Sequence, residues 1–165
     1  MARQHAPAKD KEAPERKVVA TNRKARYDYT VIETCEAGIE LRGSEVKSLR
    51  AAKAQLVDAY ASIDDGQIYL RQMHISPYDP ASYDNHEPTR TRRLLLHKAE
   101  IRRLRTKLEE KGLTMVPLSL YFRDGKVKVE LALVRGRREY DKRAKMDDRR
   151  ARNQIRSIMR GEQPE

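Results

Sequence analysis

The chain has little of several residue types, and each scarcity excludes a class of protein. Among 165 residues there are one cysteine, one phenylalanine and no tryptophan. Cys35 alone can form neither an intrachain disulfide nor a thiolate metal cluster, and a lone thiol is typical of the reducing cytosol. The amino terminus lacks the apolar stretch of a secretory signal, and no run approaches the roughly 18 apolar residues of a membrane span. We therefore expect a soluble, cytoplasmic protein with no membrane partner.

What the chain has in excess is positive charge, and most of it lies at the two ends. The formal net charge is +11. Residues 1–26 hold 8 lysines and arginines against 3 acids, and residues 135–165 hold 11 against 6, whereas the middle is close to neutral. A nearly neutral body with two basic arms is typical of a protein that binds a polyanion.

The length suits one folded domain with tails. Pro7, Pro14 and a shortage of large apolar side chains predict that residues 1–20 are a disordered basic arm. We expect residues 21–134, where the apolar residues are concentrated, to form the folded domain. Residues 135–165 then form a basic carboxyl-terminal tail.

Alternating apolar and polar residues indicate short strands in the folded part. The clearest hairpin joins residues 114–122 to residues 126–133 through Asp124-Gly125. The pattern predicts a mainly β protein with flanking helices, built on a small antiparallel OB-like β-barrel. The other expected elements are a second hairpin of residues 60–63 and 67–73, strands at residues 27–32 and 39–41 around a turn at residues 36–38, and helices at residues 44–52 and 97–111.

Features of an enzyme are scarce. No glycine pattern supports a phosphate-binding loop or a dinucleotide-binding turn, and the four histidines show no metal-ligand spacing. Asp58, Asp64 and Asp65 fit a metal-dependent nuclease cluster less well than an exposed loop acid and a hairpin turn. Ser44 has no histidine near it in sequence, and a helix-capping role accounts for it. We therefore expect a binding protein with no catalytic residues, no metal, no cofactor and no small-molecule substrate.

Two segments carry side chains suited to nucleic acid. At residues 21–27 cations stand beside Asn22 and Tyr27, which suits contact with phosphates and exposed bases, although a solvated arm explains the cations equally well. Farther on, Arg90, Arg92 and Arg93 precede three leucines, and we expect a fork of guanidinium groups anchored on a buried apolar triplet. Glu36 either shapes a turn or accepts a hydrogen bond from a base amino group.

The tail can form a helix, because neither proline nor glycine occurs between Tyr140 and Gly161. Its few apolar residues recur on one side at helical spacing. The tail is either a disordered, solvated segment or one that folds when it enters an anionic groove. The apolar pair Ile158 and Met159 favours the second alternative.

Five motifs in order resemble those of the bacterial SsrA-binding protein (small protein B) family, from Asn22 to Met159. They are NRKARYDY, EAGIELRGSEVKSLR, PTRTRRLLLHKAEI, PLSLYF, and REYDKR followed by a basic helix. The resemblance implies an OB-like barrel that binds the tRNA-like domain of transfer-messenger RNA and delivers it to stalled ribosomes for trans-translation. The barrel would stand where the anticodon arm of a tRNA lies. The tail, unstructured in the free protein, would become helical in the empty mRNA channel beyond the decoding centre.

The resemblance also implies two sets of contact residues. The RNA-facing patch corresponds to Asn22, Lys24, Tyr29, Glu36, Leu95 and His97, to which the arginine fork and the lysine after it add Arg92, Arg93 and Lys98. The tail that contacts the ribosome corresponds to Gly136 as a hinge, Tyr140, Asp141, Lys142 and Arg143 as its start, Lys145 and Arg149 as further cations, and Ile158 and Met159 as its distal apolar pair. At Asp147 and Arg150 the chain departs from the family's usual basic residue and acid.

Two other classes are considered. A general ribosomal or RNA-chaperone OB protein would bind structured RNA without the tagging pathway. A DNA-binding architectural protein fits less well, because nothing in the chain resembles a recognition helix with a dimer seam.

Overall fold

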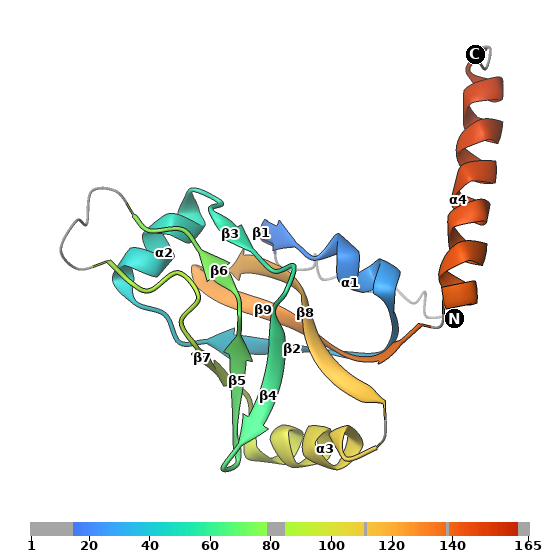
Figure 1. The fold of residues 1–165 in the computed structure, drawn as a ribbon. Helices are drawn as coiled ribbons and strands as arrows, with labels where there is room; N and C mark the ends of the chain where they lie inside the picture. The colour runs from blue at the N-terminus through green and yellow to red at the C-terminus, as the bar shows by residue number, and fades with distance from the viewer. Residues whose placement is uncertain (1–14, 79–84, 111, 138, 162–165) are drawn as a thin grey trace, which may run out of the picture.

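The computed structural model describes residues 15–78, 85–110, 112–137 and 139–161. These residues form nine strands and four helices (Figure 1). The strands are β1 (Lys17–Thr21), β2 (Tyr29–Ile39), β3 (Ala54–Gln55), β4 (Tyr60–Asp64), β5 (Gln67–Arg71), β6 (His74–Ile75), β7 (Arg92–Leu95), β8 (Leu113–Arg123) and β9 (Lys126–Gly136). The helices are α1 (Arg23–Asp28), α2 (Gly43–Arg50), α3 (Lys98–Leu108) and α4 (Glu139–Met159).

Six of the strands close into a ring. Hydrogen bonds connect β8, β4, β5, β7, β2 and β9 in that order, and β9 pairs with β8 again. All these pairings are antiparallel. The expected mainly β fold with a small antiparallel barrel and flanking helices is therefore confirmed.

The β8–β9 hairpin forms as expected, and its sequence explains why. Asp124 and Gly125 both have positive φ, 51° and 73°, which is the backbone geometry of a tight hairpin turn. Side chains of β8 are buried on both faces. Leu120 packs into the main core inside the ring, whereas Val116 and Leu118 pack under Ala25 of α1 in a second cluster.

The folded part begins earlier than expected. Strand β1 pairs with β8 in an antiparallel register that sets Lys17 opposite Phe122, so residues 17–20 are not disordered. The prediction of a disordered arm over residues 1–20 is wrong for these residues, and its first 14 residues lie outside the described part. Partly buried Val19 and Ala20 pack on the main core, and this burial explains why the strand forms.

The expected turn at residues 36–38 is also wrong, because β2 runs without a break from Tyr29 to Ile39 and pairs with β9 along its length. Its start differs as well. Asn22 Oδ1 accepts a hydrogen bond from the Ala25 amide at 3.1 Å and caps α1, so Tyr27 is helical rather than extended.

The tail forms α4, which extends away from the barrel (Figure 1). The expectation that this segment can be helical is confirmed; that it is disordered in the free protein stays a prediction. Gly136 was expected to be a swivel after the last strand, but it is the last residue of β9, pairs with Tyr29 and has no positive φ. Among the described residues no helix is long and apolar enough to cross a membrane.

Candidate nucleic-acid interface

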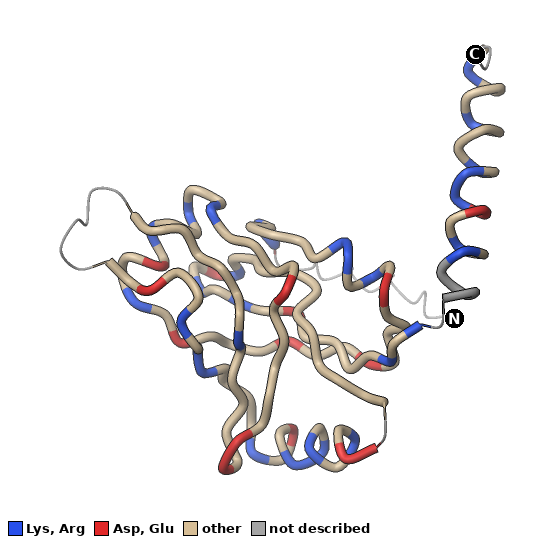
Figure 2. Tube along the Cα trace, in the orientation of Figure 1, with Lys and Arg blue, Asp and Glu red and all other residues tan. Residues whose placement is uncertain are grey.

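Basic residues recur along α4 and also mark α1 and α3 (Figure 2). Acidic residues are interspersed on the barrel, so charge alone does not outline one face. The position of each candidate side chain therefore decides which of them can act together.

Four of the expected RNA-facing residues surround one open hollow. Glu36 on β2, Arg93 and Leu95 on β7, and His97 before α3 line it together with Lys128 of β9, and its volume is about 490 Å³. We call it the β2–β7 hollow. Leu95 is 49% exposed, which is high for a leucine, so it offers an apolar surface between charged groups.

Gly38 controls how closely β2 and β7 approach beside Leu95. The two residues are cross-strand partners, and a Cβ on Gly38 would lie 3.2 Å from Leu95 Cβ. A larger residue at position 38 would therefore displace Leu95, and glycine keeps this leucine at its place in the β2–β7 hollow.

A second hollow of about 320 Å³ lies beside α1 and includes Lys24 and Tyr29. We call it the α1 hollow. Asn22 also lines it, but Asn22 is only 2% exposed and both amide hydrogens are donated to backbone oxygens, of Leu56 at 3.0 Å and Pro117 at 3.1 Å. Asn22 therefore shapes this hollow with both amide hydrogens bonded inside the fold, and its expected direct contact with RNA stays a prediction.

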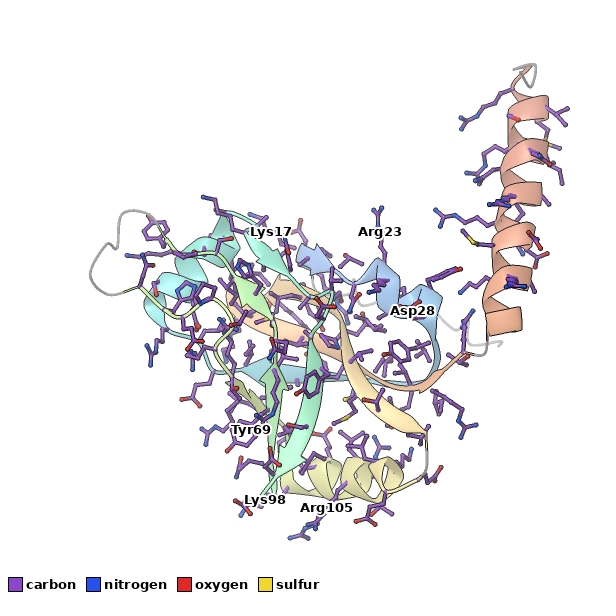
Figure 3. All side chains as sticks on the ribbon, in the orientation of Figure 1. Lys17, Arg23, Asp28, Tyr69, Lys98 and Arg105 are labelled. Carbon is purple, nitrogen blue, oxygen red and sulfur yellow. The ribbon has the colours of Figure 1, made fainter. Side chains whose placement is uncertain are left out.

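The two hollows are separate. Tyr29 and Glu36 stand seven residues apart on one strand, roughly 23 Å at the usual rise per residue. Arg23 of α1 and Lys98, the exposed first residue of α3, lie on opposite sides of the barrel (Figure 3). The single patch expected from the sequence is thus two surfaces, with Lys98 adjoining His97 of the β2–β7 hollow.

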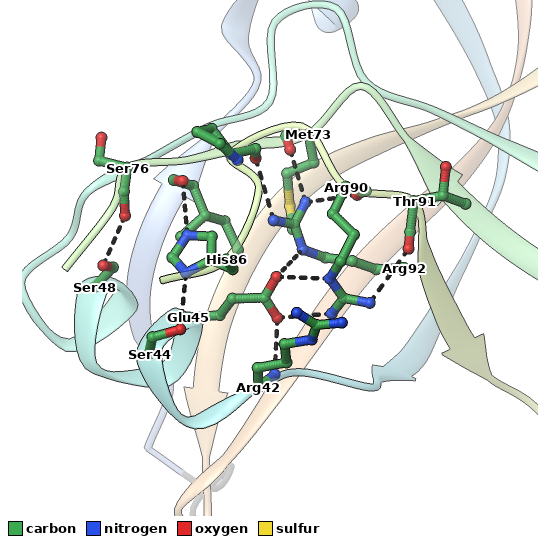
Figure 4. A network of polar contacts seen from close by, with 12 residues as sticks. Arg42, Ser44, Glu45, Ser48, Met73, Ser76, His86, Arg90, Thr91 and Arg92 are labelled. Carbon is green, nitrogen blue, oxygen red and sulfur yellow. Dashed lines mark hydrogen bonds and ion pairs between the residues drawn. The ribbon is translucent and has the colours of Figure 1, made fainter. Parts of the chain in front are cut away.

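Arg92 is not an RNA-facing residue, because its side chain is completely buried. Its Nε donates to Glu45 Oε1 at 2.9 Å, and its other nitrogens donate to the carbonyl oxygens of Met73, Arg90 and Pro88 (Figure 4). Arg90 forms a bidentate pair with the same carboxylate at 2.8 and 3.1 Å. These two arginines hold the barrel together instead of projecting from it.

The alternation of β7 explains why neighbouring residues differ. Arg92 and Leu94 point inward and are buried, whereas Arg93 and Leu95 point outward and are exposed. The expected buried leucine triplet is therefore wrong, since only Leu94 is fully buried. Arg93 remains available at the surface, where it pairs with exposed Glu40 at 2.9 Å.

The buried cluster of Glu45, Arg90 and Arg92 also fixes the start of α2. Glu45 Oε2 accepts from the Arg42 amide at 2.8 Å, which caps the helix at Arg42 rather than at the expected Ser44. Ser44 instead lies 3.0 Å from Nδ1 of buried His86, whose Nε2 is 2.9 Å from the Ile75 carbonyl oxygen. Because a carbonyl can only accept, Nε2 carries a proton and donates it to Ile75, which holds the ring between β6 and α2.

Three carboxylates are held ionised by their partners. The hydrogen bond from Tyr121 is the main cause of the lowered pKa of Glu36; burial opposes it and Arg123 adds to it. The pKa of Glu33 is lowered by the hydrogen bond from Lys107 and by Arg103. Burial alone would raise the pKa of Glu45, but hydrogen bonds from Arg90 and Arg42 and the charge of Arg92 outweigh it and lower the pKa.

We expect these lowered pKa values to make the protein acid-sensitive. In the unfolded chain the carboxylates have ordinary pKa values, so below about pH 5 the unfolded state binds more protons and stability is lost as the pH falls. Thermal unfolding followed by circular dichroism should show this loss. Glu33→Gln should lower the melting temperature near neutral pH and approach the wild-type value in acid. A difference in melting temperature that stays constant across pH would contradict the link between the lowered pKa of Glu33 and stability.

The tail residues are mostly exposed. Ile158 is 65% and Met159 84% exposed, and Arg143, Lys145 and Arg149 are exposed as well. Lys145 Nζ donates to the Arg26 carbonyl oxygen at 3.2 Å, which links the start of α4 to α1. Tyr140, Asp141 and Lys142 lie in the first turn of α4, and their side chains are outside the described part.

Sequence reasoning missed several residues near Glu36. Lys128 and Gln67 line the β2–β7 hollow, and Arg123, Lys126 and Lys128 line a neighbouring one with Glu36. Alternation along residues 126–133 could have placed Lys126 and Lys128 on the outer face of β9, but not beside Glu36, because that neighbourhood depends on pairing between distant strands. In the part of the chain described, no group of three or more His, Cys, Asp or Glu side chains is arranged to hold a metal ion.

A small barrel with flanking helices, an exposed leucine among charged groups and a basic helix define a β-barrel protein of the kind that binds nucleic acid. The model of one family, described as SmpB protein, matches residues 19–161. The chain therefore belongs to the SmpB family.

Similar proteins agree with this membership. An SsrA-binding protein of Acidothermus cellulolyticus is 59% identical over 140 residues, 85% of this chain and 88% of that protein. An SsrA-binding protein of Rhodococcus jostii is 56% identical over 140 residues, 85% of this chain and 89% of that protein. A chain of the solved structure "tmRNA-SmpB: a journey to the center of the bacterial ribosome" matches with a TM-score of 0.63 and 52% identity, over 73% of this chain and 85% of that one.

Proposed function

We propose that this protein binds the tRNA-like domain of transfer-messenger RNA and delivers it to stalled ribosomes for trans-translation, in which the unfinished peptide is tagged and the ribosome is rescued. The observation that carries the proposal is the family match, which spans both the barrel and α4. The protein acts by binding, not by catalysis, in the cytoplasm, and needs no cofactor.

The barrel, residues 21–134 extended by β1, is the RNA-binding unit. Glu36, Arg93, Leu95, His97 and Lys98 at the β2–β7 hollow contact the RNA, and the exposed leucine offers an apolar surface to an unstacked base. Lys24 and Tyr29 form a second contact surface at the α1 hollow. Cations at both hollows neutralise phosphates.

The tail, residues 135–165, is the ribosome-binding unit. The tail leaves the barrel through its first contact residues, which are Gly136, Tyr140, Asp141, Lys142 and Arg143. Lys145 and Arg149 add cations that bind ribosomal RNA. Exposed Ile158 and Met159 dock at the far end of the empty mRNA channel. A helix of this length cannot gain much stability by itself, so the tail becomes ordered when it binds.

A salt titration tests whether the protein binds the RNA through contacts with its phosphates. We expect log affinity for the tRNA-like domain to fall linearly with log salt concentration, because each neutralised phosphate releases counterions. With about six to ten phosphate contacts the loss between ~50 and ~200 mM salt is roughly 10³- to 10⁵-fold. Filter binding at several salt concentrations measures the slope. An affinity that does not change with salt would contradict the proposal.

A further inference from the structure

The surroundings of Glu36 contain an arrangement that the RNA contacts alone do not require. Glu36 on β2 reaches across β9 to two side chains of β8. Tyr121 donates its hydroxyl hydrogen to Glu36 Oε2, and Arg123 Nη1 lies 3.1 Å from both carboxylate oxygens. Lys128 of β9 pairs with Tyr121 of β8 on one side and with Gly38 of β2 on the other, so it lies between strands β8 and β2.

The remaining hydrogen-bonding capacity of Glu36 is small. A carboxylate offers about four acceptor positions, and the contacts with Tyr121 and Arg123 take three of them. One position on Oε1 is left. Because Glu36 lines the β2–β7 hollow and the neighbouring hollow with Lys126, a ligand there can reach its carboxylate.

Tyr121 is itself fixed. Its side chain is only 2% exposed, and Arg16, just before β1, stacks over its ring with the guanidinium carbon 4.9 Å from the centroid. Burial and the bond to Glu36 raise the pKa of Tyr121 to about 12, so the hydroxyl remains a donor at neutral pH. Arg16 thus covers the tyrosine that orients Glu36.

We propose that Tyr121 and Arg123 are positioning residues for RNA recognition: they fix the Glu36 carboxylate so that one oxygen position accepts from the amino group of an exposed base. The inference deepens the proposed function, since it rests on Glu36 as an RNA contact. An oriented carboxylate loses less conformational entropy on binding than a mobile one, and its acceptor suits the amino edge of cytosine, adenine or guanine. Neither Tyr121 nor Arg123 needs to touch the RNA.

The test compares Tyr121→Phe with wild type in binding to a transcript of the tRNA-like domain. The substitution removes only the hydroxyl, so the ring stays under Arg16. We expect binding to weaken about five- to tenfold at a temperature where both proteins are folded, although loss of the hydrogen bond to Glu36 also lowers the melting temperature. Tyr78→Phe is the matched control, because Tyr78 also has a cation over its ring, Lys47 at 5.4 Å, but lines neither hollow. It should bind as wild type does.

A second readout separates positioning from a general structural effect. In a Glu36→Gln background, Tyr121→Phe should change affinity less than about twofold, because the carboxylate that it orients is gone. In addition, carbon-detected NMR titration of Glu36 without RNA should show its pKa rising towards the ordinary value in Tyr121→Phe. The charges that act on Glu36, those of Arg123 and Lys128, remain in both proteins, so the hydroxyl accounts for the difference.

The outcomes distinguish this inference from the proposed function. If wild type binds the transcript and Glu36→Gln weakens binding but Tyr121→Phe does not, the positioning role is wrong and the proposed function stands. If Glu36→Gln binds as wild type does, the Glu36 contact and the positioning role both fail. If wild type does not prefer the transcript at all, the proposed function itself fails, whatever the NMR titration shows.

Discussion

Glu45→Gln is expected to destabilise the protein by about 3–5 kcal/mol, because it leaves the buried charge of Arg92 without a counter-charge. The substitution keeps the shape of the side chain, so the loss reflects charge and hydrogen bonding. Against a typical free energy of unfolding of about 5–15 kcal/mol this loss is a large fraction, so a larger share of the molecules should be unfolded at 37 °C than in the wild type. Chemical unfolding followed by circular dichroism measures the difference.

The matched control is Glu40→Gln, which removes the partner of Arg93 on the surface. The Glu40 side chain is 59% exposed, so its loss should cost no more than about 1 kcal/mol. A double variant, Glu45→Gln with Arg92→Met, should recover part of the stability because the unpaired charge is removed as well. Equal effects of Glu45→Gln and Glu40→Gln would contradict the role given to the buried cluster.

The second large effect concerns α4. A chain that ends after Arg137 should keep its affinity for the tRNA-like domain within about threefold but lose rescue of stalled ribosomes by well over tenfold. Arg137 is a better end point than Val134, the end of the domain expected from the sequence, because Arg137 is bonded to the barrel. Its amide donates to the Asp28 carbonyl oxygen at 3.0 Å, and its Nε donates to the Tyr29 carbonyl oxygen at 3.1 Å. Gel shifts measure RNA binding, and peptide tagging on ribosomes with truncated messages measures rescue.

A double substitution within α4 gives the same test without shortening the chain. Ile158→Ser with Met159→Ser should reduce rescue and leave RNA binding unchanged, because both side chains are exposed and far along the helix. Asn153→Ala, an exposed position of the same helix, is the control and should rescue normally. Loss of RNA binding in the chain that ends after Arg137 would show that the barrel and the tail do not act as separate surfaces.

Local signals explain which parts of the fold could be predicted. The two hairpins follow from Asp-Gly turns between alternating strands, and both turns adopt the positive φ angles that such residues permit. Strands β1 and β7 were not predicted because they are short and pair with residues far along the chain. The turn expected at residues 36–38 arose from Gly38, whose role is instead to let Leu95 approach.

In the candidate site, too, some residues could be predicted from the sequence and others depend on distant partners. The resemblance pointed to Glu36, Leu95 and His97, and the structure brings these three together around one hollow. Asn22 and Arg92 were expected at the surface, but the groups that bury them are distant: Glu45 is 47 residues from Arg92, and Pro117 is 95 residues from Asn22. Composition cannot reveal such partners, and the same holds for Tyr121 and Arg123 beside Glu36.

Competition between nucleic acids tests the central claim most directly. Labelled tRNA-like domain is bound to the full-length protein at near-physiological salt, and unlabelled tRNA-like RNA or duplex DNA of equal length is added. We expect the RNA to compete at least about a hundredfold better than the DNA, since specific recognition is typically ~10³-fold or more above non-specific binding. Equal competition would mean that the protein recognises only charge and would contradict the proposed function.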